Sequence, residues 1–475
     1  MNIYPGMHIH LIGIGGAGLS AIARLLLERG CQVSGSDRQD SALAQDLRLA
    51  GAQVFIGHAA AQVHAAELVI RSSAIPDANI EVQEARRLGL SVLKRADFLG
   101  ELMAESTGIA IAGTSGKTTT TAMIAWLFTA LGKDPSYIIG GVSKNLNTNA
   151  HAGQGNHFII EADEYDRMFL GLRPKMAVVT NIEHDHPDCY PSAEDFYQAF
   201  ASFAHLLPQD GTLFVCSDDP GAVRLGAETQ AITQVYTYGI DSPAARFRAT
   251  GLYANQRGGF TFEAHLESQP IQVELQVPGI HNVRNALAAL AVGYCCNLDV
   301  VQAGRALEEF SGVGRRFEVR GQVQNITLID DYAHHPTKIR ATLAAARARY
   351  PGRRVWAVWQ PHTYSRTQQF FTDFTQAFSD ADFVVVTEVY ASREQPPVGG
   401  FSSRQVVAAM PHPAAHFIPH LPQVSAFLLE QLQDGDVVIV LSAGDADQIS
   451  LQVLDALQRK ASVQPNLEER NPSHD

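Results

Sequence analysis

Apolar residues in the first hundred positions occur in two spacings. Between residues 17 and 29 they recur every three or four positions, which predicts a helix that ends at Gly30. On either side of this helix they form short, nearly continuous runs, which predict buried strands. These predicted strands are residues 8–14, 31–36, 67–73 and 90–93. Strands that alternate with helices in this way are typical of a parallel sheet with helices on its faces.

The same alternation begins again near Thr107. A predicted strand at residues 108–112 is followed by a glycine turn and a helix that extends to Leu131. Residues 247–277 alternate polar and apolar positions around two adjacent glycines, which predicts antiparallel strands added to this unit. The remaining predicted elements are strands at 157–160 and 176–180 and a helix at 282–294.

A third alternation starts near Arg315. Its predicted strands are residues 326–329, 355–359, 383–387 and 437–441. At about 150 residues per domain, a chain of 475 residues corresponds to about three domains. We therefore expect an α/β protein with three domains and a flexible polar tail. The expected boundaries are 1–106, 107–314 and 315–461, with the tail at 462–475.

Composition and charge narrow the classes of function. Apolar residues make up 46% of the chain and charged residues 18%, which excludes a disordered or coiled-coil protein. The net charge of −13 disfavours nucleic acid as a partner, while a small anionic ligand remains compatible with local positive charge. No apolar run reaches the about 20 residues needed to cross a bilayer, and no signal peptide is visible. Five cysteines without a C-x-x-C pair are typical of a reduced, cytoplasmic protein.

The turn after the first predicted strand is rich in glycine. Its sequence, Gly13-Ile-Gly15-Gly16-Ala-Gly18, opens a helix, and Asp37 stands at the end of the second predicted strand. Glycines at these positions let backbone amides approach a pyrophosphate at the helix N-terminus. The motif therefore predicts a dinucleotide or another diphosphate as ligand. A tight turn without a ligand is the alternative interpretation.

A second glycine turn carries the strongest single motif. Residues 112–120 read Ala-Gly-Thr-Ser-Gly-Lys-Thr-Thr-Thr, between a predicted strand and a predicted helix. Backbone N–H groups of such a turn surround phosphate oxygens, Lys117 can reach the β- and γ-phosphates, and the Thr118 hydroxyl can bind Mg²⁺. The general pattern has glycine where Ile111 stands, so this is a shortened P-loop. ATP is the ligand we expect here.

Two polar segments follow later strands of the same domain. Residues 161–166, Glu-Ala-Asp-Glu-Tyr-Asp, end a predicted strand beside the P-loop, where a further Mg²⁺ ligand is needed. A solvated acidic loop is the alternative interpretation. Residues 180–188, Thr-Asn-Ile-Glu-His-Asp-His-Pro-Asp, bring imidazole, carboxylate and amide groups together, which favours a metal role. A zinc site is disfavoured because no cysteine or histidine partner stands at a suitable spacing.

Further polar clusters stand at the second domain boundary and beyond it. Asn282 is expected to cap the helix that it opens. Arg315 and Arg316 are either hinge cations that close onto a phosphate or ordinary linker charge. Four more clusters follow predicted strands of the third domain, at the carboxyl edge where ligands bind in α/β sheets. They are residues 330–337, 360–367, 390–394 and 442–445.

Taken in order, these motifs resemble those of the Mur ligases over residues 8–447. The matching segments are GIGGAG, AGTSGKTTTT, EADEYD, TNIEHDHPD, HNVRNA, GRRF, DDYAHHPT, QPHTYSRT and SAGDAD. The resemblance implies a Rossmann-like domain that binds uridine diphosphate and a central P-loop ATPase-like domain with added antiparallel strands. It also implies a Rossmann-like C-terminal domain that binds an amino acid, and it accounts for the short P-loop.

The activity implied by the resemblance is an ATP-dependent ligase in peptidoglycan precursor synthesis. QPHTYSRT and YASRE favour the branch that joins L-alanine to the lactyl carboxylate of UDP-N-acetylmuramate through an acyl phosphate, with ATP and Mg²⁺ or Mn²⁺. EADEYD also occurs in muropeptide-recycling relatives that attach a tripeptide, which leaves that acceptor as an alternative. A nicotinamide-dependent dehydrogenase and a non-catalytic nucleotide sensor are rivals from other classes. We expect a cytoplasmic monomer or weak homodimer without a nucleic-acid or membrane partner.

The resemblance also implies roles for individual residues. The uridine diphosphate is expected to contact Gly15, Gly16, Ala17, Gly18, Asp37, Ser72 and Ser73. ATP is expected to contact Gly113, Thr114, Ser115, Gly116, Lys117, Thr118, Thr119, Asn282, Arg316 and Asp331. The expected metal ligands are Thr118, Glu161 and His186, and the expected amino-acid contacts are Tyr332, His334 and Arg366. The residues expected to take part in catalysis are Lys117, Glu161, His186, His334 and Arg366.

Three positions depart from the family pattern. Ser115 stands where the P-loop of relatives usually has histidine, and Tyr165 stands where many relatives have serine. Thr363 replaces a second arginine that many relatives carry. Because threonine has no charge, binding of the amino-acid carboxylate falls more heavily on Arg366.

Overall fold

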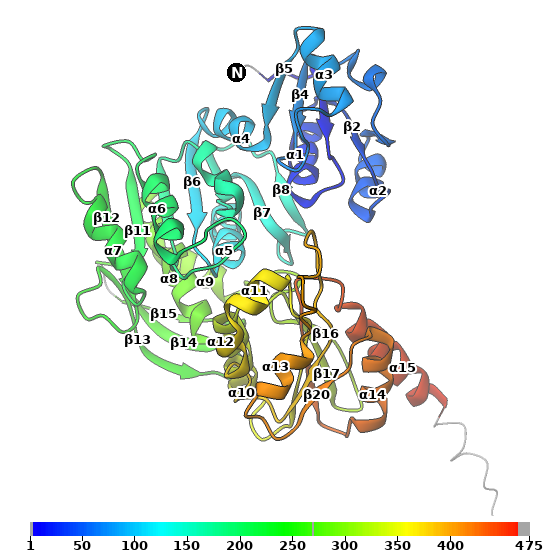
Figure 1. Cartoon of the computed structure of the whole chain (residues 1–475). Coiled ribbons are helices and arrows are strands. Elements are labelled where there is room, and N and C mark those ends of the chain that lie inside the picture. Colours follow the sequence, from blue (N-terminus) through cyan, green and yellow to red (C-terminus); the bar gives the residue numbers. More distant parts are fainter. Residues whose placement is uncertain (1–2, 268–269, 464–475) are drawn as a thin grey trace, which may run out of the picture.

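The computed structural model describes residues 3–267 and 270–463. It contains three lobes in chain order, each built around its own β-sheet (Figure 1). The first lobe is blue in the figure, the second runs from cyan to green, and the third from yellow to red. This arrangement confirms the predicted class of three α/β units. Within the described ranges, no helix is both long enough and apolar enough to span a membrane.

The first lobe contains a five-stranded parallel sheet. Its strands are β1 (His8–Ile12), β2 (Gln32–Asp37), β3 (Gln53–Ile56), β4 (Leu68–Arg71) and β5 (Ser91–Lys94), in the order β3-β2-β1-β4-β5. Its helices are α1 (Ala17–Glu28), α2 (Ala42–Leu49), η1 (Ala60–Val63, a 3₁₀ helix), α3 (Ile80–Arg87) and α4 (Arg95–Met103). The glycine-rich turn (residues 13–18) joins β1 to α1, so it lies at the carboxyl edge of the sheet, where ligands bind in such folds.

The second lobe contains a ten-stranded mixed sheet. Its strands are β6 (Thr107–Ala112), β7 (Ser136–Ser143), β8 (Thr148–His151), β9 (His157–Glu161), β10 (Met176–Val179), β11 (Thr212–Cys216), β12 (Gln234–Gly239), β13 (Phe247–Ala254), β14 (Phe260–His265) and β15 (Ile271–Glu274). Their order is β15-β14-β13-β12-β11-β10-β6-β9-β7-β8. The predicted antiparallel strands at 247–277 are confirmed, because β14 is antiparallel to both β13 and β15.

Helices cover both faces of this second sheet. They are α5 (Lys117–Ala130), η2 (Tyr165–Gly171, a 3₁₀ segment), α6 (Ala193–Ala204), α7 (Pro220–Thr229), α8 (Ile280–Cys295) and α9 (Val300–Glu308). Residues of α5, α8 and α9 form one buried core with β6. Residues of α6 form another core that continues into α1 and α4 of the first lobe. Burial on both faces explains why the central strands are continuous apolar runs.

The third lobe contains a six-stranded sheet. Its strands are β16 (Glu318–Val323), β17 (Ile326–Asp331), β18 (Val355–Trp359), β19 (Phe383–Val386), β20 (Ala415–Phe417) and β21 (Val437–Leu441), in the order β16-β17-β21-β18-β19-β20. Only β16 is antiparallel to its neighbour. The helices are α10 (Pro336–Arg349), α11 (Tyr364–Gln369), α12 (Phe371–Thr375), α13 (Arg404–Ala409), α14 (Leu421–Gln431) and α15 (Gln448–Val463). The polar clusters predicted after β17, β18, β19 and β21 therefore share one edge.

Two local predictions differ from the structure. Asn282 does not cap α8, because Gly279 occupies the cap with a φ of +94° that glycine adopts without strain. Asn282 instead lies in the first turn, where its amide donates to the Pro278 carbonyl at 2.7 Å. The predicted tail begins inside α15, which extends through residue 463, and residues 464–475 lie outside the described residues. The expected domain boundaries stay a prediction.

Candidate active site

The P-loop (residues 112–120) joins β6 to α5 in the second lobe. Gly113 has a φ of +138°, and a Cβ there would meet the Thr180 hydroxyl at 1.9 Å. The Ser115 N–H donates to the side-chain oxygen of Asn181 at 2.9 Å, which holds the turn from outside. The Ser115 hydroxyl is buried and has no hydrogen-bond partner in the described structure. Asn181 holds this turn in place, and the buried Ser115 hydroxyl is left to bond with a polar ligand.

Lys117 begins α5 and points back into this turn. Its ammonium donates to the Gly113 carbonyl at 2.6 Å and forms an ion pair with Glu164 at 2.7 Å. Burial acts to lower the pKa of Lys117, but Glu164 and Glu161 outweigh burial and raise it. Burial likewise acts to raise the pKa of Glu164, and the Lys117 cation holds that pKa at about 2. Lys117 is therefore a full cation at the phosphate-binding turn.

Glu161 ends β9 beside the P-loop. One of its oxygens accepts the Gly140 N–H at 2.9 Å. Burial raises the pKa of Glu161, although the nearby Lys117 and Arg316 cations oppose the shift. The Thr118 hydroxyl is close enough to bond with this carboxylate. A desolvated carboxylate beside a hydroxyl is a donor set suited to Mg²⁺.

The third predicted metal ligand, His186, lies apart from that pair. Its Nε2 is 3.4 Å from Glu164 rather than beside Glu161, and its backbone has a φ of +56°. No three His, Cys, Asp or Glu side chains gather into a metal cage within residues 3–267 and 270–463. A divalent ion here would therefore take most of its ligands from a nucleotide and water, as Mg²⁺ commonly does.

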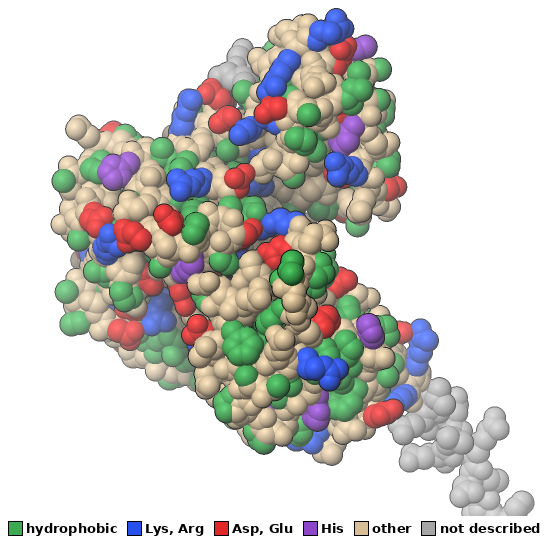
Figure 2. All heavy atoms as spheres, in the orientation of Figure 1, with side chains coloured by type: hydrophobic (Ala, Val, Ile, Leu, Met, Phe, Trp, Pro, Cys, Tyr) green, Lys and Arg blue, Asp and Glu red, His purple; other side chains and the backbone are tan. Residues whose placement is uncertain are grey.

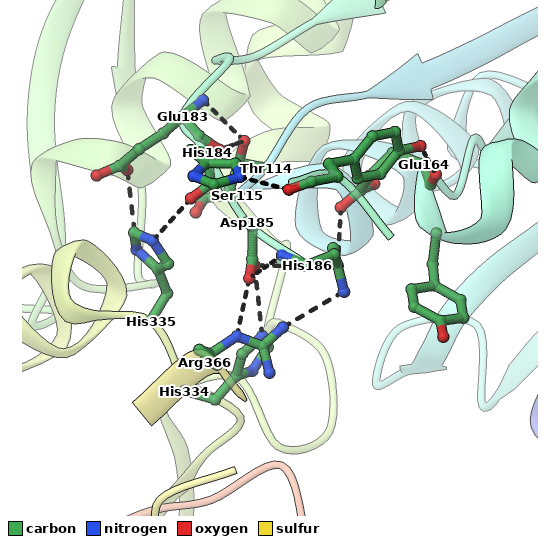
Figure 3. A network of polar contacts seen from close by, with 12 residues as sticks. Thr114, Ser115, Glu164, Glu183, His184, Asp185, His186, His334, His335 and Arg366 are labelled. Atoms are coloured by element: carbon green, nitrogen blue, oxygen red, sulfur yellow. Dashed lines mark hydrogen bonds and ion pairs between the residues drawn. The ribbon is translucent and has the colours of Figure 1, made fainter. Parts of the chain in front are cut away.

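Asp185 is the centre of a buried network between the second and third lobes (Figure 3). One carboxylate oxygen accepts the Arg366 Nε–H at 2.8 Å and the His186 backbone N–H at 2.7 Å. The other oxygen lies 3.6 Å from the Lys338 ammonium and 3.9 Å from His334 Nε2. Burial acts to raise the pKa of Asp185, and Arg366 together with the other cations holds it well below its ordinary value. Asp185 is thus ionised although no part of it is exposed.

Two histidines of the third lobe line the same network in neutral form. The Nδ1–H of His334 donates to the Tyr332 carbonyl at 2.8 Å. Burial, helped by Lys338 and Arg366, lowers the pKa of His334 well below its ordinary value. His362 lies 3.0 Å from Arg366, and burial lowers its pKa to about 4. Positive charge here therefore comes from arginine and lysine rather than from histidine.

Only one of the two arginines at the domain boundary reaches the P-loop. Arg316 donates to the Thr118 hydroxyl at 3.2 Å, and its guanidinium lies over the Tyr332 ring at 4.9 Å. Arg315 instead donates to the carbonyls of Ser442 and Gly444 within the third lobe. Of these two arginines, only Arg316 therefore lies where a cation reaching from the domain boundary to the ATP site was expected.

The glycine-rich turn of the first lobe is held by Asp37. The carboxylate accepts the Gly15 N–H at 2.9 Å, so in this structure Asp37 faces the turn itself. Arg95, at the start of α4, lies over Gly18, where an added Cβ would be 1.6 Å from the guanidinium. Arg95 also pairs with Asp163 of the second lobe at 3.3 Å. A cation therefore stands between the turn and the P-loop lobe.

One cavity of about 1290 Å³ connects these features. It is lined by residues of all three lobes, and Figure 2 shows the surface hollowed between the first and third lobes. Predicted site residues that line it are Ala17, Gly18, Thr114, Ser115, Gly116, Lys117, Thr118, Thr119, Glu161, His186, Asn282, Arg316, Asp331, Tyr332, His334 and Arg366. The predicted residues outside its lining are Gly15, Gly16, Asp37, Ser72, Ser73 and Gly113.

Several residues of the site were given no role from sequence. Glu164 and Asp185 belong to the polar segments 161–166 and 180–188, in which other residues were expected to bind metal. Nothing in their neighbouring sequence sets these two carboxylates apart. Lys338 and Arg95 belong to helices, at positions where the sequence pattern predicts an ordinary solvent-facing side chain. Tyr165, one of the departures from the family pattern, donates to Asp188 at 3.1 Å. Glu164, Lys338, Arg95 and Tyr165 line the cavity, and only the folded lobes bring them together there.

The fold and the cavity together define a class of protein. A P-loop with a charged lysine, a second glycine-rich turn and buried cations from a third lobe meet around one space, as in an ATP-dependent ligase of several domains. Domain comparisons agree with this class. Residues 8–107 match the Mur ligase family catalytic domain, residues 111–293 the Mur ligase middle domain, and residues 315–444 the Mur ligase glutamate ligase domain. The chain belongs to the Mur ligase family.

Individual relatives cover nearly the whole chain. It is 44% identical over 454 residues to UDP-N-acetylmuramate–L-alanine ligase of Renibacterium salmoninarum, with 95% of this chain and 96% of the relative covered. The ligase of the same name from Salinibacter ruber is 42% identical, with 95% of each chain covered. The crystal structure of UDP-N-acetylmuramate–alanine ligase from Thermotoga maritima superposes with a TM-score of 0.79 at 28% identity, covering 96% of this chain and all of that one. A murein peptide ligase from Psychrobacter arcticus superposes with a TM-score of 0.70 at 27% identity, covering 95% and 99%.

Proposed function

We propose that this chain is an ATP-dependent ligase that joins L-alanine to the lactyl carboxylate of UDP-N-acetylmuramate, a cytoplasmic step of peptidoglycan precursor synthesis. The observation that carries the proposal is the single cavity of about 1290 Å³, which Gly18, Lys117 and Arg366 line from three different lobes. A reaction that joins a nucleotide-linked acid to an amino acid with ATP needs three binding regions around one space. The relatives that carry this activity in their names support the choice of substrates.

The chemistry proceeds in two steps. A carboxylate oxygen attacks the γ-phosphorus of ATP, the bond from that phosphorus to the ADP oxygen breaks, and an acyl phosphate forms with release of ADP. The neutral amine of L-alanine then attacks the acyl carbon, and phosphate leaves with the bonding electron pair. Loss of a proton from the nitrogen completes the amide. An acyl phosphate hydrolyses in open water, so the third lobe is expected to cover it.

At the ATP end, the P-loop residues Gly113 to Thr119 are proposed to surround the phosphates, with the Lys117 ammonium on the transferred group. Thr118 and Glu161 are proposed to hold Mg²⁺ or Mn²⁺, which offsets phosphate charge when bound. The buried Glu161 carboxylate, whose pKa burial raises, fits such a cation. His186 is proposed for a second ion.

Three further residues complete the proposed ATP site. Asn282 lies in the first turn of α8 and is proposed to contact the adenine ring. Arg316, which already donates to Thr118, is proposed to contact the phosphates. Asp331 accepts two backbone N–H groups, from Phe317 and Ala333, at 2.7 Å each. These bonds fix the carboxylate at the end of β17, which supports a role in orienting the nucleotide.

At the other two ends, the substrates are proposed to meet the first and third lobes. Backbone groups of residues 15–18 face the diphosphate, with Asp37, Ser72 and Ser73 near the nucleotide. The amino acid is proposed to contact Tyr332, His334 and Arg366. Arg366 donates its Nε–H to Asp185, and its two terminal nitrogens lie 3.0 Å from His362 and 3.4 Å from His186, so a bound carboxylate would replace these histidine contacts. An arginine fixed by one carboxylate is pre-oriented for a second.

The experiment that tests this proposal is phosphate release by the purified full chain with ATP and UDP-N-acetylmuramate. L-Alanine should stimulate release and yield the amide product by mass spectrometry. The tripeptide acceptor of the recycling ligases serves as the comparison, because murein peptide ligases share the fold. Turnover with the tripeptide but not with L-alanine would reassign the acceptor, and turnover with neither would reject the ligase proposal.

A further inference from the structure

Lys338 is a buried cation for which the proposed function gives no role. It lies in the first turn of α10 and lines the cavity, with 14% of its side chain exposed. Its nearest polar partners in the described structure are His334 Nε2 at 3.5 Å and Asp185 at 3.6 Å. Both distances exceed the ordinary hydrogen bond of an ammonium group, about 2.7–3.2 Å. The ammonium is therefore desolvated without a close partner.

The negative charge closest to Lys338 is shared with a second cation. Asp185 already accepts the Arg366 Nε–H at 2.8 Å on its other oxygen, so one carboxylate faces two cations. A buried cation without full compensation is costly, and such an arrangement is stable when an anion completes it. The charged and titratable groups that interact with Lys338 are Asp185, Glu183, His334, His335, Lys117, Arg316 and Arg366.

The position of these cations indicates which anion is bound. Lys117 belongs to the P-loop, and Arg316 donates to Thr118, the next residue of that loop. Both are close enough to Lys338 to repel its charge. Arg366, by contrast, is held by its hydrogen bond to Asp185. The space that Lys338 shares with Lys117 and Arg316 is therefore the one next to the γ-phosphate of a nucleotide in the P-loop.

We propose that Lys338 binds the phosphoryl group in transit from ATP to the substrate carboxylate. This assignment rests on the proposed ligase function. As the carboxylate oxygen bonds to the γ-phosphorus and the bond to the ADP oxygen breaks, negative charge remains on the three other oxygens of that phosphorus. Lys338 donates hydrogen bonds to them and keeps its own proton. The third lobe thereby supplies a second catalytic cation in addition to Lys117 of the P-loop lobe.

The protonation state of Lys338 makes the proposal measurable. Burial lowers its pKa to about 8, with Lys117, Arg366 and Arg316 acting in the same direction and Asp185 opposing them. In the free enzyme the cation is therefore lost as the pH rises through about 8. The rate of acyl phosphate formation at subsaturating ATP, which reports groups of the free enzyme, should fall over that range. Arginine stays charged throughout, so Lys338→Arg should remove this fall.

The test measures ADP formation in a single turnover by rapid quench, with ATP and UDP-N-acetylmuramate and without L-alanine. Lys338→Met should slow it by about 100-fold, as for other lost donors to developing charge. Lys338→Arg should retain most of the rate at pH 7 and show no decline between pH 7.5 and about 9, a range set by the lowered pKa. Lys460→Met, at an exposed position of α15, is the matched control and should behave as wild type.

Each outcome separates the two proposals. Wild-type enzyme that forms no ADP with this substrate, whether L-alanine is absent or added, would reject the ligase function and the assigned step with it. An active wild type with an equally fast Lys338→Met variant would overturn the role of Lys338 alone. A variant with normal ADP formation but a raised KM for L-alanine would likewise overturn it, because Lys338 would then bind the amino-acid carboxylate. If Lys338→Met does not fold, the pH profile of Lys338→Arg decides, and a retained decline contradicts the proposal.

Discussion

Replacing Asp185 with asparagine should cost more stability than any other single change of charge at the contact between the second and third lobes. Asparagine keeps an oxygen that can accept the Arg366 and His186 N–H groups, so the loss is chiefly one of charge. At an effective dielectric constant of about 20, a carboxylate 3.6 Å from an ammonium is stabilised by about 4 to 5 kcal/mol. That distance is the one between Asp185 and Lys338. The Arg366 pair, at 2.8 Å, adds to it.

Part of this gain is offset by the desolvation of the carboxylate. Removing one partner of a buried ion pair typically leaves a net loss of about 3–5 kcal/mol, which is the magnitude we expect for Asp185→Asn. Because the pKa of Asp185 is lowered, its contribution is fully present above the pKa of an unfolded aspartate. It disappears only as the pH falls through the lowered value. Measurements at pH 7 therefore report the whole effect.

The assay is urea unfolding followed by tryptophan fluorescence. Trp126 reports on the second lobe, and Trp356 and Trp359 report on the third. Asp188→Asn is the matched control, since Asp188 pairs with Arg393 across the same two lobes at 2.7 Å. That arginine is 50% exposed, so the control should lose about 1 kcal/mol or less. Equal losses in the two variants would refute the argument that burial sets the strength of the Asp185 network.

Three further outcomes are expected at the substrate ends. Lys117→Ala should abolish turnover while calorimetry shows near-native affinity for UDP-N-acetylmuramate, and a large loss of that affinity would mean that the two sites are not separate. Arg95→Ala should weaken UDP-N-acetylmuramate binding by about 1.5–3 kcal/mol if its guanidinium bonds to the diphosphate, with the KM for ATP unchanged. Arg366→Ala should raise the KM for L-alanine by the equivalent of about 2–5 kcal/mol with little change for ATP. Unchanged alanine kinetics would remove that role from Arg366 and leave the ligase proposal in place.

The pattern of apolar residues was sufficient to predict the central strands. Residues 355–359 and 437–441 are β18 and β21 without a shift, because strands buried on both faces read as unbroken apolar runs. The edge strand β3 was missed, since it has only four residues and none of them is fully buried. The cap of α8 was misassigned because the choice between Gly279 and Asn282 depends on a positive φ that the sequence does not reveal.

The site was predictable only where a motif is local. The P-loop could be located from its own sequence because turn, lysine and hydroxyl are contiguous. Asp185 and Arg366 are 181 positions apart, so their pairing depends on how two lobes meet. Lys338 lies within a helix of mixed polar and apolar residues, where a lysine ordinarily faces solvent. Its burial comes from the covering second lobe, which no pattern within α10 indicates.

One segment links the nucleotide site to the third lobe. The loop at residues 180–188 is bonded to the P-loop, because the Thr114 hydroxyl donates to the Glu183 carbonyl at 2.7 Å and accepts the Glu183 N–H at 2.9 Å. On its other side, the Glu183 carboxylate accepts the Thr337 hydroxyl, and the His184 carbonyl lies 3.2 Å from His335 Nε2 (Figure 3).

These contacts attach the third lobe to the same residues that fix the P-loop. A shift of Thr114 when phosphates enter the turn would move Glu183, and Glu183 is the residue that receives Thr337 at the start of α10. A displacement of Glu183 would therefore be felt by both the P-loop and the third lobe. Because an acyl phosphate must be kept from water until the amine arrives, a ligase benefits when the lobe that covers it is held by the loop that contacts the ATP site.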